Sequence, residues 1–419
     1  MTKRAKNNTL IEIVHPICCG LDVHKDKISA CLINVDDNGK EQHEIREFSS
    51  FTQDLQKMKT WLIENKCPVV AMESTGVYWH PVYNTIENAM EVVLVNARHI
   101  KNVPGRKTDI CDSKWLAGLI RHGLVKGSFI PPEHVREWRE LSRLRKIYTE
   151  SLADYKRRVH KLFITANIKI DSIVSDLFGL TGLNLIDLLC KNDELTLEKV
   201  QECTKGRLKK KVPELHQSLH GYFKDHHRFQ LIGMMEAIGM FQRQIEQINV
   251  RLESLTRDHK DLLERLDEIP GVDKKSAQSI IGEVGVTLDE FESAAAFVSW
   301  SGLCPGNNES AGKRKSGRNA VRNHPFKTIV VQVAWAAIKK KGSYYKTKYY
   351  KLKARRGARK AIVAIAHRIA KAIYNIIKNG DKYRDLGEEY FTKVNKQRVL
   401  KNLVKKAEEL GMKLVPCEG

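Results

Sequence analysis

Four carboxylates in the first part of the chain have the types and the spacing that bind a divalent metal ion. Asp22 lies within one apolar run and Glu73 ends another, so both are predicted to lie on buried strands. Asp109 and Asp112 lie three residues apart at the start of a helical pattern and therefore share one helix face. Such oxygen ligands suit Mg²⁺, and a pair of metal ions can act on a phosphodiester.

Each acid also has a structural explanation. A buried strand acid is costly unless it is paired or metal-bound, which favours a ligand role for Asp22, whereas Glu73 could simply mark a strand end. Asp109 and Asp112 follow Thr108, a candidate helix cap, and the helix dipole alone explains acids in a first turn. It is the order of two strand acids followed by two helix acids that favours a joint metal site.

Residues 14–128 are predicted to form one α/β domain that positions these acids. The expected strands are 16–24, 27–35, 41–48, 68–73 and 91–96, with a hairpin turn at 36–39 and helices at 51–65, 78–89 and 109–122. Three meandering strands followed by alternating helices and strands are the order of a ribonuclease H-like fold. In that fold the first strand, the fourth strand and the last helix bring their acids together.

Residues 132–269 are predicted to be helical, with an insertion at 170–224 that contains no recognisable chemistry. Apolar residues alternate at three- and four-residue spacing over more than five heptads, which predicts a coiled coil. Its partner could be an earlier helix of the same chain or a second chain. The seam consists of Leu231, Met234, Ile238, Phe241, Ile245, Ile248, Leu252, Leu255, His259, Leu262, Leu266 and Ile269.

Residues 270–390 are predicted to form a mostly helical C-terminal domain, followed by a charged tail at 391–419. Pro270-Gly271 ends the long helix, and the hairpin around it could offer backbone N–H groups to a phosphate or be a plain helical corner. A polar loop at 304–318 precedes expected helices at about 324–340 and 358–379.

The net charge of +22 is concentrated in one segment. Residues 1–130 hold 17 Lys and Arg against 15 Asp and Glu, whereas residues 310–380 hold 20 Lys and Arg and no acid. Such a segment is typical of a surface that binds the phosphate backbone of nucleic acid, with a solvated or membrane-surface face as the alternative. Interleaved aromatic residues that can stack on bases favour nucleic acid: Trp335, Tyr344, Tyr345, Tyr349 and Tyr350.

The cysteine pattern predicts a reducing cytoplasm. The nine cysteines show neither CxxC spacing nor a disulfide framework. No apolar stretch approaches the ~20 residues of a membrane span, and no apolar segment follows the basic start, so neither membrane insertion nor secretion is expected.

Several motifs resemble those of a known family over about residues 17–380. Gly20-Leu21-Asp22-Val23-His24-Lys25, Met72-Glu73-Ser74-Thr75-Gly76 and the segment 107–114 are similar to the DEDD motif of insertion-sequence transposases of the "one-ten" family. Ile269-Pro270-Gly271-Val272, and Ser301-Gly302-Leu303-Cys304-Pro305 with the loop after it, resemble the C-terminal transposase domain of that family.

The resemblance implies a RuvC-like N-terminal domain in which Asp22, Glu73, Asp109 and Asp112 bind Mg²⁺. It implies a C-terminal serine that forms a phosphoserine link to DNA, and a structured guide RNA of the bridge type that pairs with donor and target DNA. Dimers that join into tetramers are also implied, in the cytoplasm of a bacterial or archaeal cell and associated with its nucleoid.

The serine of the family falls on Ser310, five residues after Pro305. The usual Ser-Gly is Ser310-Ala311-Gly312 here, which leaves Ser316 as a competitor; without the resemblance Ser310 would be a loop serine or a helix cap. Flanking cations could clamp the phosphate, and a second cluster is predicted to bind nucleic acid. These residues are Lys313, Arg314 and Arg318 near the serine, and Arg355, Arg356, Arg359 and Lys360 farther along.

Three functions therefore compete. The first is an RNA-guided DNA recombinase that uses both metal and serine. The second is a RuvC-like nuclease or junction resolvase that hydrolyses DNA with metal alone. The third is a non-catalytic RNA- or DNA-binding scaffold, which intact carboxylates at all four positions disfavour.

Overall fold

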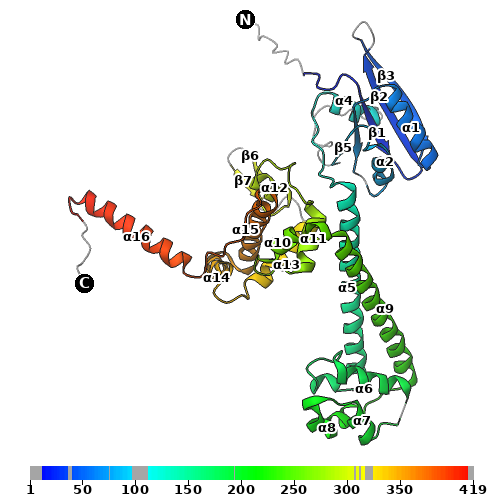
Figure 1. Ribbon diagram of the computed structural model, residues 1–419, viewed down its shortest axis with the longest axis vertical. Coiled ribbons are helices and arrows are strands. Elements are labelled where there is room, and N and C mark those ends of the chain that lie inside the picture. Colours follow the sequence, from blue (N-terminus) through cyan, green and yellow to red (C-terminus); the bar gives the residue numbers. More distant parts are fainter. Residues whose placement is uncertain are drawn as a thin grey trace. The chain divides into compact units, whose positions relative to one another are not determined.

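The computed structural model describes residues 12–35, 40–74, 76–96, 112–192, 194–305, 308–310, 313–316 and 324–413. For 308–310, 313–316, 392–395 and 397–398 it describes the backbone alone. The chain forms two compact units that join between Ile130 and Pro131. Figure 1 labels the elements of both.

The first unit is built on a five-stranded mixed sheet with the strand order β3-β2-β1-β4-β5. β1, β2 and β3 are antiparallel, whereas β4 and β5 run parallel to β1. The elements in chain order are β1 (Cys18–Val23), β2 (Lys27–Val35), β3 (Glu41–Ser49), α1 (Thr52–Glu64), β4 (Val69–Glu73), α2 (Trp79–Ile86), β5 (Glu91–Val95) and α4 (Asp112–Arg121). The expected α/β unit is confirmed and is consistent with a ribonuclease H-like domain, while the predicted turn at 36–39 lies outside the described residues.

The two faces of this sheet are covered differently (Figure 1). Side chains of a strand alternate between faces, so Leu21 and Met72 pack into one core with α1 and α2. Cys18 and Ala71 pack into a second core on the opposite face, against α4. The even-numbered positions of β1 and the odd-numbered positions of β4 therefore face α4.

The second unit begins with two long helices, α5 (Glu133–Thr165) and α9 (Asp225–Leu255), that pack along each other (Figure 1). The stretch between them has its own apolar core, which includes Phe163 and Leu185. Its elements are η1 (Ile170–Ser172), α6 (Leu180–Lys191), α7 (Leu197–Cys203), η2 (Gly206–Lys211) and α8 (Val212–Ser218). The partner of α9 is thus a helix of the same chain, one of the two alternatives that the sequence left open.

The expected coiled coil is not confirmed, although every residue of its seam is buried or half-buried. The helix stops at Leu255, and a 3-10 turn, η3 (Arg257–His259), separates α9 from α10 (Lys260–Asp267). At the break, the hydroxyl of Thr256 bonds to the carbonyl of Glu253, which competes with continued helical bonding. The ring of His259 stacks beside that of Trp138, 6.2 Å between centroids.

The C-terminal helices pack around α15, whose apolar face is buried from Ala361 to Ile376. The elements are α11 (Lys274–Val284), α12 (Ala294–Trp300), β6 (Asn308–Ser310), β7 (Lys313–Ser316), α13 (Pro325–Ala337), α14 (Tyr344–Arg356), α15 (Ala358–Asn379) and α16 (Tyr390–Glu409). Two of these, α13 and α15, confirm the expected helices at 324–340 and 358–379.

Gly271 shows that the hairpin between α10 and α11 is a structural corner. Its φ is +86°, which favours glycine, and an added Cβ would lie 2.5 Å from the carbonyl oxygen of Val333 and 2.6 Å from the nitrogen of Ala337. The corner therefore packs directly on the backbone of α13. This contact favours the helical corner over a phosphate-binding hairpin.

Three arginines fasten α5 to α11. Arg139 donates to the carbonyl oxygens of Gly282 (2.9 Å) and Glu283 (2.7 Å), which belong to the last turn of α11, where a helix cannot satisfy its own carbonyls. Arg143 binds both carboxylate oxygens of buried Glu283 at 2.7 and 2.8 Å. Arg145, also buried, donates to the side chain of Gln278 at 2.8 Å. These charge-assisted bonds hold the long helix against the C-terminal helices.

Candidate active site and nucleic-acid interface

Asp22 and Glu73 lie on neighbouring strands of the sheet and on the same face. β1 and β4 are parallel, with Leu21 opposite Met72, so Asp22 and Glu73 are the next pair along. Both continue the alternation that turns Gly20 and Ala71 toward α4. The side chain of Asp22 is 24% exposed, so a ligand can reach it.

Asp112 begins α4, the helix that covers this face. Ser113, the next residue, makes a hydrogen bond of 3.2 Å through its hydroxyl to the hydroxyl of Ser29. Ser29 is the β2 residue directly opposite Asp22. The first turn of α4 is thus tied to the strand position beside Asp22, while Asp109 lies outside the described residues.

Gly20 explains how α4 comes so close to β1. A Cβ at this position would lie 2.1 Å from the carbonyl oxygen of Ser113 and 2.4 Å from the nitrogen of Ala117. Only a residue without a side chain allows this approach of helix backbone to strand backbone. Gly20 therefore sets the distance between the strand that carries Asp22 and the helix that begins at Asp112.

Three residues close to Asp22 in the sequence complete the description of this strand. The Nε2 atom of His24, an exposed residue, lies 3.2 Å from a carboxylate oxygen of Asp22. Cys18 and Cys19 are fully buried, and burial raises the pKa of the Cys18 thiol to about 12. Because the thiolate is the nucleophile, neither cysteine is an alternative catalytic group.

The described residues contain no group of three or more His, Cys, Asp and Glu side chains that could hold a metal ion. Asp109 is not among them, so this result concerns only Asp22, Glu73 and Asp112 of the four predicted ligands. Their chemistry nevertheless fits Mg²⁺, because all are carboxylates, the hard oxygen donors that this ion prefers.

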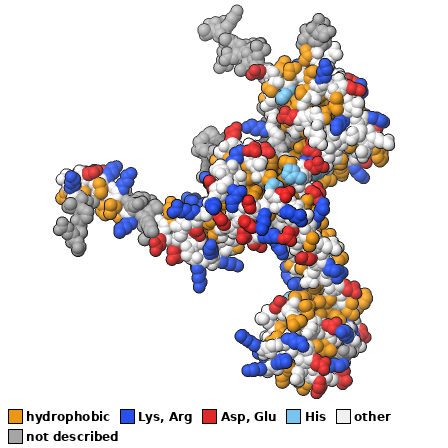
Figure 2. Space-filling model, viewed as in Figure 1, with side chains coloured by type: hydrophobic (Ala, Val, Ile, Leu, Met, Phe, Trp, Pro, Cys, Tyr) orange, Lys and Arg blue, Asp and Glu red, His pale blue; other side chains and the backbone are white. Residues whose placement is uncertain are grey.

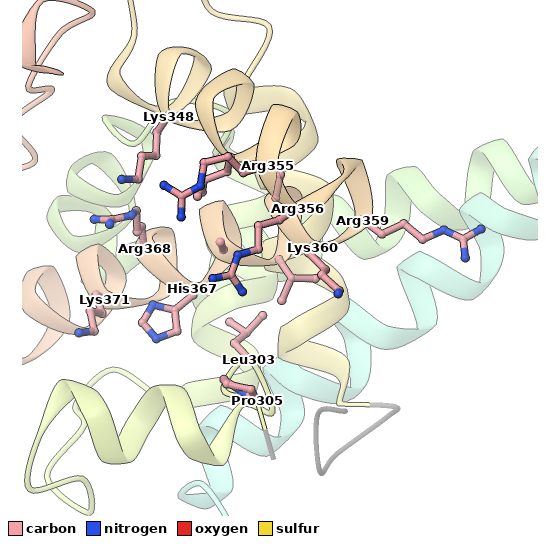
Figure 3. A pocket seen from close by; sticks show the side chains of 14 residues that line it. Leu303, Pro305, Lys348, Arg355, Arg356, Arg359, Lys360, His367, Arg368 and Lys371 are labelled. Atoms are coloured by element: carbon pink, nitrogen blue, oxygen red, sulfur yellow. The ribbon is translucent and has the colours of Figure 1, made fainter. Parts of the chain in front are cut away.

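The second unit contains a basic pocket between α14 and α15, with a volume of about 860 Å³ (Figure 3). Side chains from both helices extend toward it, and Figure 2 shows Lys and Arg gathered over this part of the surface. All four cations predicted in the second cluster line it. The charged and titratable lining residues are Lys348, Arg355, Arg356, Arg359, Lys360, His367, Arg368 and Lys371.

Four of these residues were not predicted from the sequence: Lys348, His367, Arg368 and Lys371. A signal was available for three of them, because Lys360, Ala364, His367, Arg368 and Lys371 follow helical spacing and share one face of α15. Lys348 lies one turn before Leu352 on α14, a helix that was not predicted separately.

The aromatic residues of the basic segment do not all face outward. Tyr344, Tyr345 and Tyr349 are buried in the described structure, which removes them as stacking platforms for bases. Trp335 and Tyr350 are 43% and 55% exposed. The prediction that all five rings could stack is wrong, because each of the three buried rings contacts an aromatic ring outside α14.

The predicted serine positions lie on a small antiparallel hairpin rather than in an irregular loop. Ser310 ends β6 and pairs with Lys313, while Ser316 ends β7 and pairs with Asn308. Arg314 is also on β7, and Arg318 lies outside the described residues. Pro305, five residues before Ser310, lines the basic pocket.

Two protein-family models match the chain, and together they cover more than half of it. One, described as "Transposase" and named for DEDD transposases of the IS110 type, matches residues 19–167. The other, described as "Transposase IS116/IS110/IS902 family", matches residues 263–351. No curated protein is similar enough to count as a match.

The α/β unit with its acids, the basic helices and these matches define a DNA transposase, an enzyme that cuts and joins DNA strands. The chain belongs to the IS110 family of transposases, as its motifs indicated. DEDD domains of this kind typically depend on a divalent metal ion. No helix among the described residues is long and apolar enough to cross a membrane.

Proposed function

We propose that this transposase breaks and rejoins DNA with two groups of residues, a RuvC-like acidic quartet and a serine. Asp22, Glu73, Asp109 and Asp112 would hold Mg²⁺, and Ser310 would be the nucleophile. The observation that carries the proposal is that Asp22 and Glu73 directly follow the paired residues Leu21 and Met72 on parallel strands, on the face covered by the helix that starts at Asp112.

The role of the acidic residues follows from this placement. Asp22 and Glu73 lie at the carboxyl ends of neighbouring parallel strands, and Asp112 begins the helix that covers the same face. A cation bound there would offset the repulsion between their negative charges. When bound, Mg²⁺ neutralises charge on the phosphate and lowers the pKa of an attacking hydroxyl. The rigid sheet fixes Asp22 and Glu73, and the contact at Gly20 fixes the start of α4.

The serine step conserves the energy of the phosphodiester. The Ser310 Oγ forms a bond to phosphorus while the bond from phosphorus to one strand oxygen breaks. The hydroxyl proton leaves to a base, and the released strand oxygen takes up a proton. Rejoining reverses these changes with another strand end, so no ATP is needed, in keeping with the lack of a Gly-x-x-x-x-Gly-Lys loop in the sequence.

The basic pocket and the cations near the serine would bind the DNA backbone. Arg355, Arg356, Arg359 and Lys360 line one concave surface, and no acid contributes to that lining. Lys313, Arg314 and Arg318 would clamp the phosphate that Ser310 attacks. A guide RNA of the bridge type, dimers that join into tetramers, and a site of action on the nucleoid complete the proposal, and these rest on membership of the family.

An adduct assay tests the proposal directly. Purified protein is mixed with Mg²⁺ and a nicked DNA substrate that traps intermediates, then denatured with SDS and separated by electrophoresis. We expect a protein–DNA adduct that resists SDS. The adduct should not form when EDTA is present from the start of the reaction. Cleavage without any adduct would instead favour the nuclease that hydrolyses DNA with metal alone. RNA that co-purifies with the protein can be sequenced from the same preparation.

A further inference from the structure

The basic pocket is concave, so it can hold more than the duplex backbone that its cations are proposed to bind. Its volume of about 860 Å³ lies in the range of sites for small organic ligands. A duplex presents an evenly charged convex backbone, for which a shallow groove is sufficient. A pocket of this volume offers space for a group that leaves the duplex.

The lining of the pocket is divided by chemistry. Aliphatic residues from both helices and from the segment after α12 contribute to the lining, whereas long cationic side chains surround it (Figure 3). Val363 and Ala364 are only half-buried, as is Leu352 across from them, so apolar surface remains open to a ligand. The aliphatic lining residues are Leu303, Pro305, Leu352, Ala361, Val363 and Ala364.

His367 adds a neutral polar group between these two kinds of surface. Burial lowers the pKa of its imidazole, and the charges of Lys371 and Arg368 lower it further. The other cations that line the pocket are Lys348, Arg355 and Arg356 on α14 and Arg359 and Lys360 on α15. At neutral pH the ring therefore offers one hydrogen-bond donor and one acceptor.

We propose that this pocket holds an unpaired nucleotide of DNA, with the base against the aliphatic surface and the flanking phosphates on the cations. His367 would bond to an edge of the base, since it is the titratable lining residue that is not a lysine or an arginine. DNA is chosen because a transposase acts on DNA and must open its strands. The inference rests on the proposed function and adds the single-stranded form of the substrate.

Fluorescence anisotropy with two labelled DNA hairpins tests the inference. One hairpin is blunt, and the other ends in three unpaired nucleotides. We expect the full-length protein to bind the overhang hairpin about fivefold more tightly than the blunt one. Ala364→Leu adds a branched side chain over the half-buried aliphatic surface without removing a charge, and it should abolish this preference.

Ala354→Leu is the matched control, because Ala354 is exposed on α14 and is not part of the lining. It should keep the full preference. Circular dichroism checks that both variants fold. Equal affinity of the wild type for both hairpins would overturn the inference, and so would a preference that survives Ala364→Leu.

Two further measurements distinguish failure of this inference from failure of the proposed backbone interface. A hairpin with an RNA overhang that binds more tightly than the DNA overhang, and loses this advantage in Ala364→Leu, would contradict the assignment to DNA. The blunt hairpin tests the proposed backbone interface separately, through neutralisation of Arg355, Arg356, Arg359 and Lys360. If that change leaves binding of the blunt hairpin intact, the backbone interface fails while the overhang preference is still measured.

Discussion

The α/β unit and the C-terminal helices differ in the number and the placement of their charged residues. The first unit is close to charge balance, and it places Asp22 and Glu73 at the carboxyl ends of two neighbouring strands. The C-terminal segment 310–380 carries 20 Lys and Arg and no acid, and eight basic or histidine residues line one pocket. A few acids on rigid strands suit chemistry on a metal ion, whereas many cations on helices suit binding of a polyanion.

The comparison predicts that changes in the two units separate catalysis from binding. If the acids only stabilise the fold, or if the cations only keep the protein soluble, this separation disappears.

Removing one charge at the sheet edge should have the largest effect. Asp22→Asn or Glu73→Gln should reduce strand cleavage by roughly 1,000-fold or more, because a proposed metal ligand is lost. DNA affinity should stay within about twofold, since the basic residues are untouched. Glu44→Gln on exposed β3 is the control and should cleave normally. Equal losses of cleavage and binding would mean that the acids mainly maintain the fold.

Neutralising the cations of the pocket should weaken DNA binding instead. Changing Arg355, Arg356, Arg359 and Lys360 to glutamine should weaken DNA binding by about 100-fold at moderate salt and flatten the dependence of affinity on salt. The slope of log affinity against log salt should fall by about 0.9 for each phosphate that is no longer neutralised. Lys339, Lys340 and Lys341 are exposed cations outside the pocket, and their joint change to glutamine serves as the control. An unchanged slope would show that the cluster faces solvent.

Gly20→Ala should affect the acidic edge through geometry alone. The new Cβ would meet backbone atoms of α4, so the helix must move away from β1 at a cost of about 2–3 kcal/mol. Cleavage should fall with the thermal stability of the unit, while DNA binding remains. Gly118→Ala lies on the same helix with open space around it and should be neutral or stabilising. Normal cleavage by Gly20→Ala would show that the spacing of Asp22 and Asp112 is not critical.

His324 should give the C-terminal helices a measurable pH dependence. Burial lowers its pKa to about 4, and its Nδ1 atom is buried without a hydrogen-bond partner among the described residues. The unfolded chain protonates first, so stability is full above about pH 6.5 and is lost as the pH falls toward 4. Between pH 7 and 5 the loss of folding stability due to His324 is about 2 kcal/mol. The melting temperature of His324→Phe should therefore fall less over this pH range than that of the wild type. An equal fall in both proteins would contradict the assignment.

Much of the first unit could be predicted from the sequence because its signals are local. Apolar runs bounded by polar turns locate β1, β4 and β5 to within two residues. The pairing of Asp22 with Glu73 could also be expected, because the strand order of the fold places the first and fourth strands together. The contact at Gly20 could not, since it depends on how closely α4 approaches.

The second unit was harder to predict because its features depend on tertiary packing. The heptad seam indicated which residues are buried, but not that the helix breaks at Thr256. Tyr344, Tyr345 and Tyr349 share a basic segment with exposed Tyr350, and only packing between helices decides which rings are buried. The pocket joins residues of α14 and α15 across a turn, so composition revealed its charge but not its shape.

The serine mechanism is tested by identifying the residue that becomes linked to DNA. The adduct formed by the wild type is digested, and the DNA-linked peptide is mapped by mass spectrometry. We expect a link at Ser310, no adduct from Ser310→Ala, and an adduct from Ser316→Ala. A link at Ser316 would move the nucleophile to the other strand of the hairpin. Normal recombination by both single variants would contradict the serine mechanism itself.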